Sequence, residues 1–193
     1  MTRIIVVSDS HGLVEPLESI YEHYKDRVQT FIHCGDSELL KDHPLLNIYQ
    51  TVKGNCDFEP FPETLTIELG NRKIIVTHGH KYGVKFGLGR LKQLGLANHA
   101  DLVCYGHTHK PYFYHDDEIS ILNPGSIRSN RGFRRIPECF ALIEWDDQLS
   151  VTFIDVKTFE PIDIYYFPKF YIVFIELRSY LLFFFYITKI WTS

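Results

Sequence analysis

Aspartate, asparagine and histidine residues recur in short motifs that each contain or adjoin a glycine. The motifs are Asp9-x-His11, Gly35-Asp36, Gly54-Asn55, His78-Gly79-His80 and Gly106-His107-x-His109. A mixed set of imidazole, carboxylate and amide oxygen ligands suits Mn, Fe, Zn or Ni better than a thiolate-only or all-oxygen site. Any one motif is weak evidence, because short motif matches are often false positives. Five in one chain predict a transition-metal site.

A short apolar, β-branched run precedes each motif. These runs are Ile4–Val7, Thr30–His33, Ile48–Val52, Ile74–Thr77 and Leu102–Tyr105, and a sixth, Ile119–Leu122, precedes Asn123-Pro124-Gly125-Ser126. Runs that are apolar on both faces predict central strands of a sheet covered on both sides. Open α/β sheets place ligands at the carboxyl ends of their strands, so we expect the motifs to meet at one edge.

Helical spacing of apolar residues appears in two segments. The first contains Leu13, Leu17, Ile20, Tyr21 and Tyr24, with Pro16 suited to an early turn. The second is Val84–Leu94, and Gly95 is placed to end it. From Glu138 onward we expect three strands in succession: Cys139–Trp145, Leu149–Val156 and Ile162–Phe167, with Asp146-Asp147-Gln148 as a hairpin turn. This order of elements favours a layered α/β sandwich in one domain.

Composition narrows the class of protein. The chain has 193 residues, of which 45% are hydrophobic and 23% charged, as expected for one globular domain. The net charge of −4 argues against stable nucleic-acid binding. It is compatible with a phosphate-bearing substrate, since bound cations would invert the local charge. Four isolated cysteines and no secretion signal predict a reduced, cytoplasmic protein.

Taken in order, the five motifs resemble those of the calcineurin-like metallophosphoesterase superfamily. The sequences Gly54-Asn55-Cys56-Asp57 and Asn123-Pro124-Gly125-Ser126 are typical of its small bacterial and archaeal phosphodiesterase branch. The resemblance extends from Ile4 to about Phe167. It implies an α/β fold, a four-layer α-β-β-α sandwich of two mixed sheets, within a metallophosphoesterase domain at 1–169.

The resemblance also implies a ligand set. Asp9, His11 and His109 would bind the first metal, Asn55, His78 and His107 the second, and Asp36 would bridge both. Two divalent transition-metal ions are expected, Mn²⁺ first, with Ni²⁺, Fe²⁺ or Zn²⁺ as alternatives. Asp36, Asn55 and His78 are expected to take part in catalysis, with a metal-bridged hydroxide as the nucleophile.

The sequence departs from the usual pattern of this superfamily at the position of the general acid. Many members of the superfamily have a histidine where this chain has Cys56, and that histidine is thought to protonate the leaving oxygen. A thiol of ordinary pKa is a poor general acid for an alkoxide. We interpret Cys56 as filling space behind Asn55, and we expect substrates with good leaving groups. His80 is an alternative proton donor, or a structural residue.

Arginine and aromatic residues stand out near the C-terminus. Arg128, Arg131, Arg134 and Arg135 form a basic cluster that could hold a substrate phosphate, or a solvated loop. Residues 170–193 form a nearly continuous apolar, aromatic tail outside the resemblance. Glu176 and Arg178 interrupt it, which disfavours a membrane span. A packing element, a homo-oligomer contact and a non-native end remain open for it.

The motifs therefore favour an enzyme that hydrolyses small phosphate esters, with phosphodiesters preferred. Two alternatives remain. The retromer subunit of the same superfamily uses the fold as a protein-interaction scaffold, but part of its ligand set is replaced, whereas every ligand position is filled here. A phosphomonoesterase would differ only in its substrate pocket.

Overall fold

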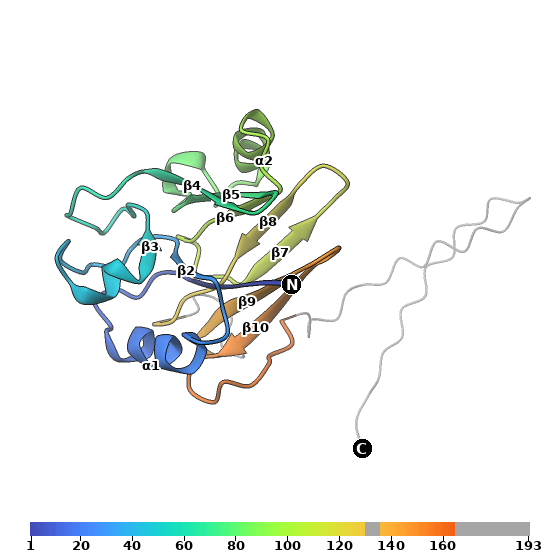
Figure 1. Cartoon of the computed structure of the whole chain (residues 1–193). Helices are drawn as coiled ribbons and strands as arrows, with labels where there is room; N and C mark the ends of the chain where they lie inside the picture. Colours follow the sequence, from blue (N-terminus) through green and yellow to red (C-terminus); the bar gives the residue numbers. More distant parts are fainter. Residues whose placement is uncertain (130–135, 165–193) are drawn as a thin grey trace, which may run out of the picture.

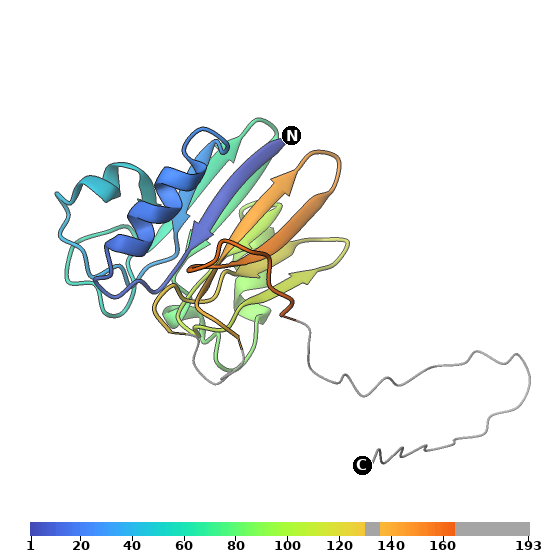
Figure 2. The same cartoon turned by 90° about the horizontal axis from the view of Figure 1, so that it is seen from below.

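Two five-stranded mixed sheets pack face to face in the computed structural model, which describes residues 1–129 and 136–164 (Figures 1 and 2). The first sheet has the order β10-β9-β1-β2-β3 and the second β4-β5-β6-β8-β7. The first consists of β1 (Thr2–Val7), β2 (Thr30–His33), β3 (Tyr49–Thr51), β9 (Cys139–Trp145) and β10 (Leu149–Asp155). The second consists of β4 (Thr64–Leu69), β5 (Arg72–Thr77), β6 (Leu102–Cys104), β7 (Tyr112–His115) and β8 (Ser120–Asn123).

Each outer face of this pair of sheets carries one α-helix (Figure 1). A buried cluster that includes Ile4, Ile74 and Trp145 fills the space between the sheets. A second cluster joins the first sheet to α1 (Glu15–Tyr24), and a third joins the second sheet to α2 (Gly89–Ala97). Two short 3₁₀ helices, η1 (Pro44–Asn47) and η2 (His80–Tyr82), complete the described elements. The predicted α-β-β-α sandwich is confirmed.

The two helices differ in how well the sequence predicts them. In α1, Pro16 lies in the first turn, and Leu17, Ile20 and Tyr24 are buried. In α2, the predicted bounds are wrong, because the helix begins at Gly89 and continues past Gly95 to Ala97. A Cβ at Gly95 would overlap side-chain atoms of Ile119 and Val103. Gly95 therefore allows close packing of α2 on the sheet instead of ending the helix.

All six strands predicted in the first two-thirds of the chain are present. Two further strands in this region, β4 and β7, were not predicted. Both are edge strands of the second sheet, and their residues are largely half-exposed or exposed. β4 alternates polar and apolar residues, and neither strand is buried on both faces as a central strand is.

The C-terminal hairpin of β9 and β10 is confirmed, with its turn at 146–148. The strand expected at Ile162–Phe167 is wrong in its described part. Only an isolated bridge pairs Ile154 with Pro161, and the Ile162 N–H donates to the Phe153 carbonyl. Residues 165–167, the proposed boundary at 169 and the 170–193 tail lie outside the described residues. Within residues 1–129 and 136–164, neither helix is long and apolar enough to cross a bilayer.

Candidate metal centre

The carboxyl ends of parallel strands from both sheets meet at one edge of the sandwich. Strands β1, β2 and β3 run parallel in one sheet, as do β5, β6 and β8 in the other. The Asp9 N–H donates to the Gly35 carbonyl within the first sheet. The His107 N–H, which follows β6, donates to Oδ2 of Asp9 at 3.1 Å. Asp9 thus joins the two sheets at the motif-bearing edge.

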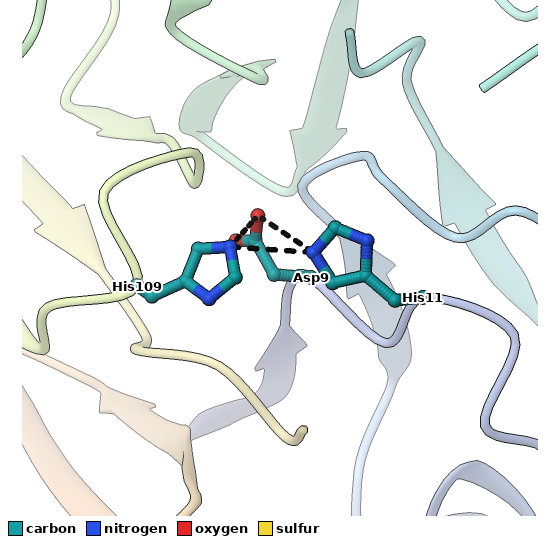
Figure 3. Close-up of side chains that lie close together, drawn as sticks. All are labelled: Asp9, His11 and His109. Atoms are coloured by element: carbon teal, nitrogen blue, oxygen red, sulfur yellow. Dashed lines mark hydrogen bonds and ion pairs between the residues drawn. The ribbon is translucent and has the colours of Figure 1, made fainter. Parts of the chain in front are cut away.

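Asp9, His11 and His109 form the first cluster of candidate ligands (Figure 3). Oδ1 of Asp9 lies 3.1 Å from Nε2 of His109 and 4.0 Å from Nε2 of His11. The two Nε2 atoms are 3.3 Å apart. Oδ1 of Asp9 is buried and has no hydrogen-bond partner among the described residues. A buried carboxylate oxygen without such a partner, facing two ring nitrogens, fits a bound cation.

Hydrogen bonds to the other ring nitrogen orient three of the histidines. Nδ1 of His109 donates to the Ser129 carbonyl at 2.8 Å, and Nδ1 of His78 donates to the Cys34 carbonyl at 2.8 Å. Nδ1 of His11 donates to the Glu38 carboxylate at 2.6 Å. Carbonyl and carboxylate oxygens can only accept, so the proton of each neutral ring is on Nδ1. Each Nε2 then directs a lone pair toward the cluster, as metal ligation requires.

Asp36, Asn55 and His78 meet in a second cluster. Nε2 of His78 lies 3.3 Å from Oδ2 of Asp36 and 3.2 Å from Oδ1 of Asn55. The ring of His107 is 5.2 Å from that of His78, centroid to centroid. Ligand atoms of Asp36 lie within 4.8 Å of ligand atoms of both Asp9 and His11. Asp36 is therefore positioned between the two clusters.

Left-handed backbone conformations concentrate at the candidate ligands. Positive φ angles occur at Asp9 (54°), His11 (46°), Asp36 (55°), His107 (68°) and His109 (56°). Each such non-glycine residue costs about 1 kcal/mol or more. These residues turn the chain sharply after a strand and bring their side chains inward. Strain at five of the seven candidate ligands is typical of a functional site rather than of core packing.

The motif glycines allow the close approach of neighbouring loops. A Cβ at Gly54 would overlap the carboxylate and backbone nitrogen of Asp36, and a Cβ at Gly106 would overlap the Ser8 hydroxyl. Any larger residue at either position would push the loops apart.

Protonation states in the centre suit cation binding. Burial opposes ionisation of Asp9, but the neighbouring His109 and His78 outweigh it, and the pKa of Asp9 is lowered. Burial likewise opposes ionisation of Asp36, but His78 outweighs it and lowers that pKa as well. Burial, with the charges of His78 and Lys85, lowers the pKa of His107 to about 4. Ionised carboxylates and neutral imidazole are the forms that bind metals.

His78 alone among these groups shows a raised pKa. Burial would lower the pKa of His78, but the neighbouring carboxylates of Asp36 and Asp9 outweigh that effect and raise it. A cation bound at Nε2 would compete with the proton that these carboxylates attract.

Sequence reasoning missed Asp57, which organises the second cluster. Its carboxylate accepts hydrogen bonds from the N–H groups of Asp36 (2.8 Å), Gly54 (2.7 Å) and Glu38 (2.7 Å), and from the Ser37 hydroxyl (3.1 Å). The side chain is 6% exposed. Asp57 closes the G-N-C-D motif, and that position was the available signal.

The Asn123-Pro124-Gly125-Ser126 turn supports the histidine loop. The Ser126 hydroxyl donates to the Asp9 carbonyl at 2.9 Å and accepts from the Ser129 N–H at 3.0 Å. The Asn123 side-chain amide donates to the Gly106 carbonyl and to the Thr108 hydroxyl. The turn therefore fixes the positions of Asp9 and His109.

Cys56 and His80 lie beside the candidate ligands. The Cys56 N–H donates to Oδ1 of Asp36 at 2.7 Å, and its Sγ lies within 4.8 Å of ligand atoms of Asp36 and His11. The thiol thus faces the cluster, which differs from the space-filling role interpreted from the sequence. Burial, together with the charge of Asp36, raises the pKa of Cys56 to about 11. Nδ1 of His80 is buried and has no hydrogen-bond partner in the described part of the chain.

Arg128 is the one member of the predicted basic cluster within the described residues. Its guanidinium donates to the His11 carbonyl at 2.6 Å, beside the first group of ligands. Arg131, Arg134 and Arg135 lie outside the described residues.

Two known proteins are similar to this chain over most of their own length. The chain is 42% identical over 158 residues to a Bacillus subtilis protein named "Probable metallophosphoesterase YsnB", covering 79% of this chain and 90% of the relative. It is 33% identical over 182 residues to the Escherichia coli phosphodiesterase YfcE, covering 78% of this chain and 91% of the relative.

Solved structures share the fold. A predicted phosphoesterase from Streptococcus pneumoniae superposes with a TM-score of 0.76 at 40% identity, covering 80% of this chain and 90% of that one. Vps29 from Entamoeba histolytica, solved with Zn²⁺, superposes with a TM-score of 0.66 at 23% identity, covering 84% and 99%. The profile of the calcineurin-like phosphoesterase superfamily domain matches residues 2–148. This chain therefore belongs to the calcineurin-like phosphoesterase superfamily.

Proposed function

We propose that this chain hydrolyses small phosphodiesters with the help of two divalent transition-metal ions, of which Mn²⁺ is the preferred cation. Asp9, His11 and His109 would hold one ion, Asn55, His78 and His107 would hold the other, and Asp36, between the two clusters, would serve both. The main support is the convergence of the Nε2 atoms of His11 and His109 on a buried Asp9 oxygen without a hydrogen-bond partner among the described residues. The phosphodiesterase name of the E. coli relative supports diesters.

Protein groups around the candidate ligands fix their orientation and protonation state for cation binding. Glu38 and the Ser129 carbonyl hold the rings of His11 and His109 with each Nε2 unprotonated. The Cys56 N–H orients the Asp36 carboxylate. Bound cations would supply a hydroxide nucleophile at neutral pH and neutralise charge on the phosphate. We expect Arg128, whose guanidinium donates to the His11 carbonyl, to contact a phosphate oxygen of the substrate.

In the described part of the chain, the site lacks an efficient general acid to protonate the leaving group. The raised pKa of Cys56, about 11, keeps the thiol protonated but makes it a poor general acid. We therefore expect substrates with good leaving groups to react fastest. His80, whose Nδ1 is buried without a partner among the described residues, is the alternative donor.

The scaffold and phosphomonoesterase alternatives predict different results in one experiment. The full-length protein, stripped of metal and reloaded with Mn²⁺, is assayed against bis-p-nitrophenyl phosphate, p-nitrophenyl phosphate and cyclic nucleotides, with Asp36→Asn as the matched control. We expect the diester to be hydrolysed faster than the monoester, and Asp36→Asn to abolish the activity.

A faster monoester reaction would identify a phosphomonoesterase instead. Rates equal to those of the metal-free protein for every substrate would contradict catalysis and favour a scaffold.

A further inference from the structure

A pocket of about 510 Å³ opens next to the histidine loop. Thr108, which lies between the candidate ligands His107 and His109, forms part of its wall. Lys85, Gly87 and Leu88, in the segment between η2 and α2, also line it. A volume of this size accommodates a ligand of roughly nucleotide dimensions.

The walls of this pocket are largely apolar and aromatic. Tyr105, which is 3% exposed, and Tyr112, which is 44% exposed in the edge strand β7, both line it. Leu88 and Pro111 add aliphatic surface. Aromatic and aliphatic walls of this kind bind the face of a planar ring, because stacking and apolar burial both favour it.

Lys85 brings a positive charge to the same pocket. Lys85 and Lys110 both line it, and none of the described residues that line it is acidic. This contrasts with the net charge of −4 for the whole chain. The charge of Lys85 also acts on His107, where it contributes to the lowered pKa. A positive region this near the candidate ligands favours an anionic substrate group.

We propose that this pocket binds the second substituent of the phosphodiester and selects a nucleotide-like group, an aromatic ring that carries a further phosphate. The inference rests on the proposed diester hydrolysis. In that reaction the OH of water bonds to phosphorus and its other proton goes to the departing oxygen. The group in the pocket then stays on the phosphate or departs as the alcohol.

Three diesters with the same p-nitrophenolate leaving group separate the contributions of ring and charge. The first is methyl p-nitrophenyl phosphate, which has no ring in its second substituent. The second is the p-nitrophenyl ester of thymidine 5′-phosphate, which adds the ring. The third is the p-nitrophenyl ester at the 5′-phosphate of thymidine 3′,5′-bisphosphate, which adds a second phosphate. For the full-length Mn²⁺-loaded protein we expect kcat/KM to increase in that order, by about tenfold for the ring and about tenfold for the second phosphate.

Two surface variants and one control assign these preferences to the pocket. Lys85→Gln should remove most of the preference for the second phosphate, and Tyr112→Ala most of the preference for thymidine over methyl. Lys81→Gln is the matched control, because Lys81 is exposed in the preceding η2, pairs with Glu63 and does not line the pocket. Equal kcat/KM for the three diesters in the wild type would overturn the proposal. So would a preference that survives both pocket variants.

Calorimetry separates failure of this inference from failure of the proposed function. Thymidine 3′,5′-bisphosphate is titrated into the full-length protein in EDTA, with inorganic phosphate for comparison. Binding that is at least about tenfold tighter than for phosphate, and weakened by Lys85→Gln, supports the pocket even if no diester is hydrolysed. Absence of such binding overturns the pocket, whether or not bis-p-nitrophenyl phosphate is hydrolysed.

Discussion

Nε2 of His11 lies 3.3 Å from Nε2 of His109, although the two residues are 98 positions apart in the chain. Because Glu38 and the Ser129 carbonyl hold the protons on Nδ1, two lone pairs face each other next to the Asp9 carboxylate. Nothing in ordinary packing favours that arrangement, whereas a cation between the three groups makes it favourable.

Glu38 should control metal affinity through the ring of His11. Glu38→Ala removes the acceptor for Nδ1, so the ring can turn away, and we expect Mn²⁺ affinity to fall by about 10–100-fold. Glu38→Gln keeps an acceptor oxygen and should lose less. The measurement is a competitive chelator titration, with Glu22→Ala on α1 as the control, since Glu22 is exposed and pairs with Lys25. Unchanged affinity in Glu38→Ala would show that His11 needs no support.

Asp57 should matter more for stability than for any direct contact with a cation. Asp57→Asn replaces an acceptor oxygen by an NH₂ group and leaves buried N–H donors without partners. We expect the free energy of unfolding to fall by about 3 kcal/mol. Urea denaturation of the metal-free protein measures this loss, and Asp117→Asn, at an exposed turn, should change little. Equal midpoints for both variants would refute the assigned role.

His33 should make the metal-free protein sensitive to acid. Burial lowers its pKa to about 4 from 6.5, so the folded state stays neutral while the unfolded chain takes up a proton. The free energy of unfolding should therefore fall as pH drops from about 6.5 to about 4, by up to about 3 kcal/mol. Above pH 6.5 both states are neutral and this contribution disappears.

The test of that pH dependence is the difference between wild type and His33→Gln in urea denaturation at pH 8 and pH 5, both in EDTA. We expect the variant to show a smaller fall between the two pH values, while exposed His23→Gln follows the wild type. Parallel behaviour of His33→Gln and the wild type would remove His33 as the cause.

The central strands were predictable because their signal is local. Runs such as Ile4–Val7 are apolar on both faces, and the residues that follow them mark the ligand-bearing edge. The edge strands β4 and β7 were not predictable in this way, since only part of each is buried. Gly95 shows a further limit of prediction from the sequence. Its role depends on Ile119 and Val103, which only the tertiary fold brings near.

The supporting residues of the site were harder to predict than the ligands. A ligand such as His109 is recognisable by its type and motif, but Glu38 and Asp57 act through loops that close only in the folded chain. The left-handed backbone at Asp9 and His107 has the same origin, because the surrounding structure imposes it. Apart from the position of Asp57 at the end of the G-N-C-D motif, the spacing of residues along the sequence does not indicate these contacts.

Removal of the C-terminal tail should preserve the site. All seven proposed ligands precede Lys110, and residues 170–193 contain no Cys or His. We expect truncation after Lys169 to retain metal stoichiometry and most of the turnover number, and to improve solubility by removing an aromatic segment. Thermal unfolding and diester hydrolysis of the truncated chain are the measurements. An unfolded product would show that the domain extends into the tail.

Metal stoichiometry is the most direct test of the two-cation centre. The full-length protein is stripped with chelator, reloaded with Mn²⁺, desalted and measured by elemental analysis beside Asp36→Asn and the exposed control Asp117→Asn. Asp36 lies within 4.8 Å of ligand atoms of both clusters, so its loss should weaken both sites. We predict two Mn²⁺ per chain in the wild type and in Asp117→Asn, and fewer than one in Asp36→Asn. A wild-type chain that retains no transition metal after reloading, or the same metal content in all three proteins, would contradict the centre.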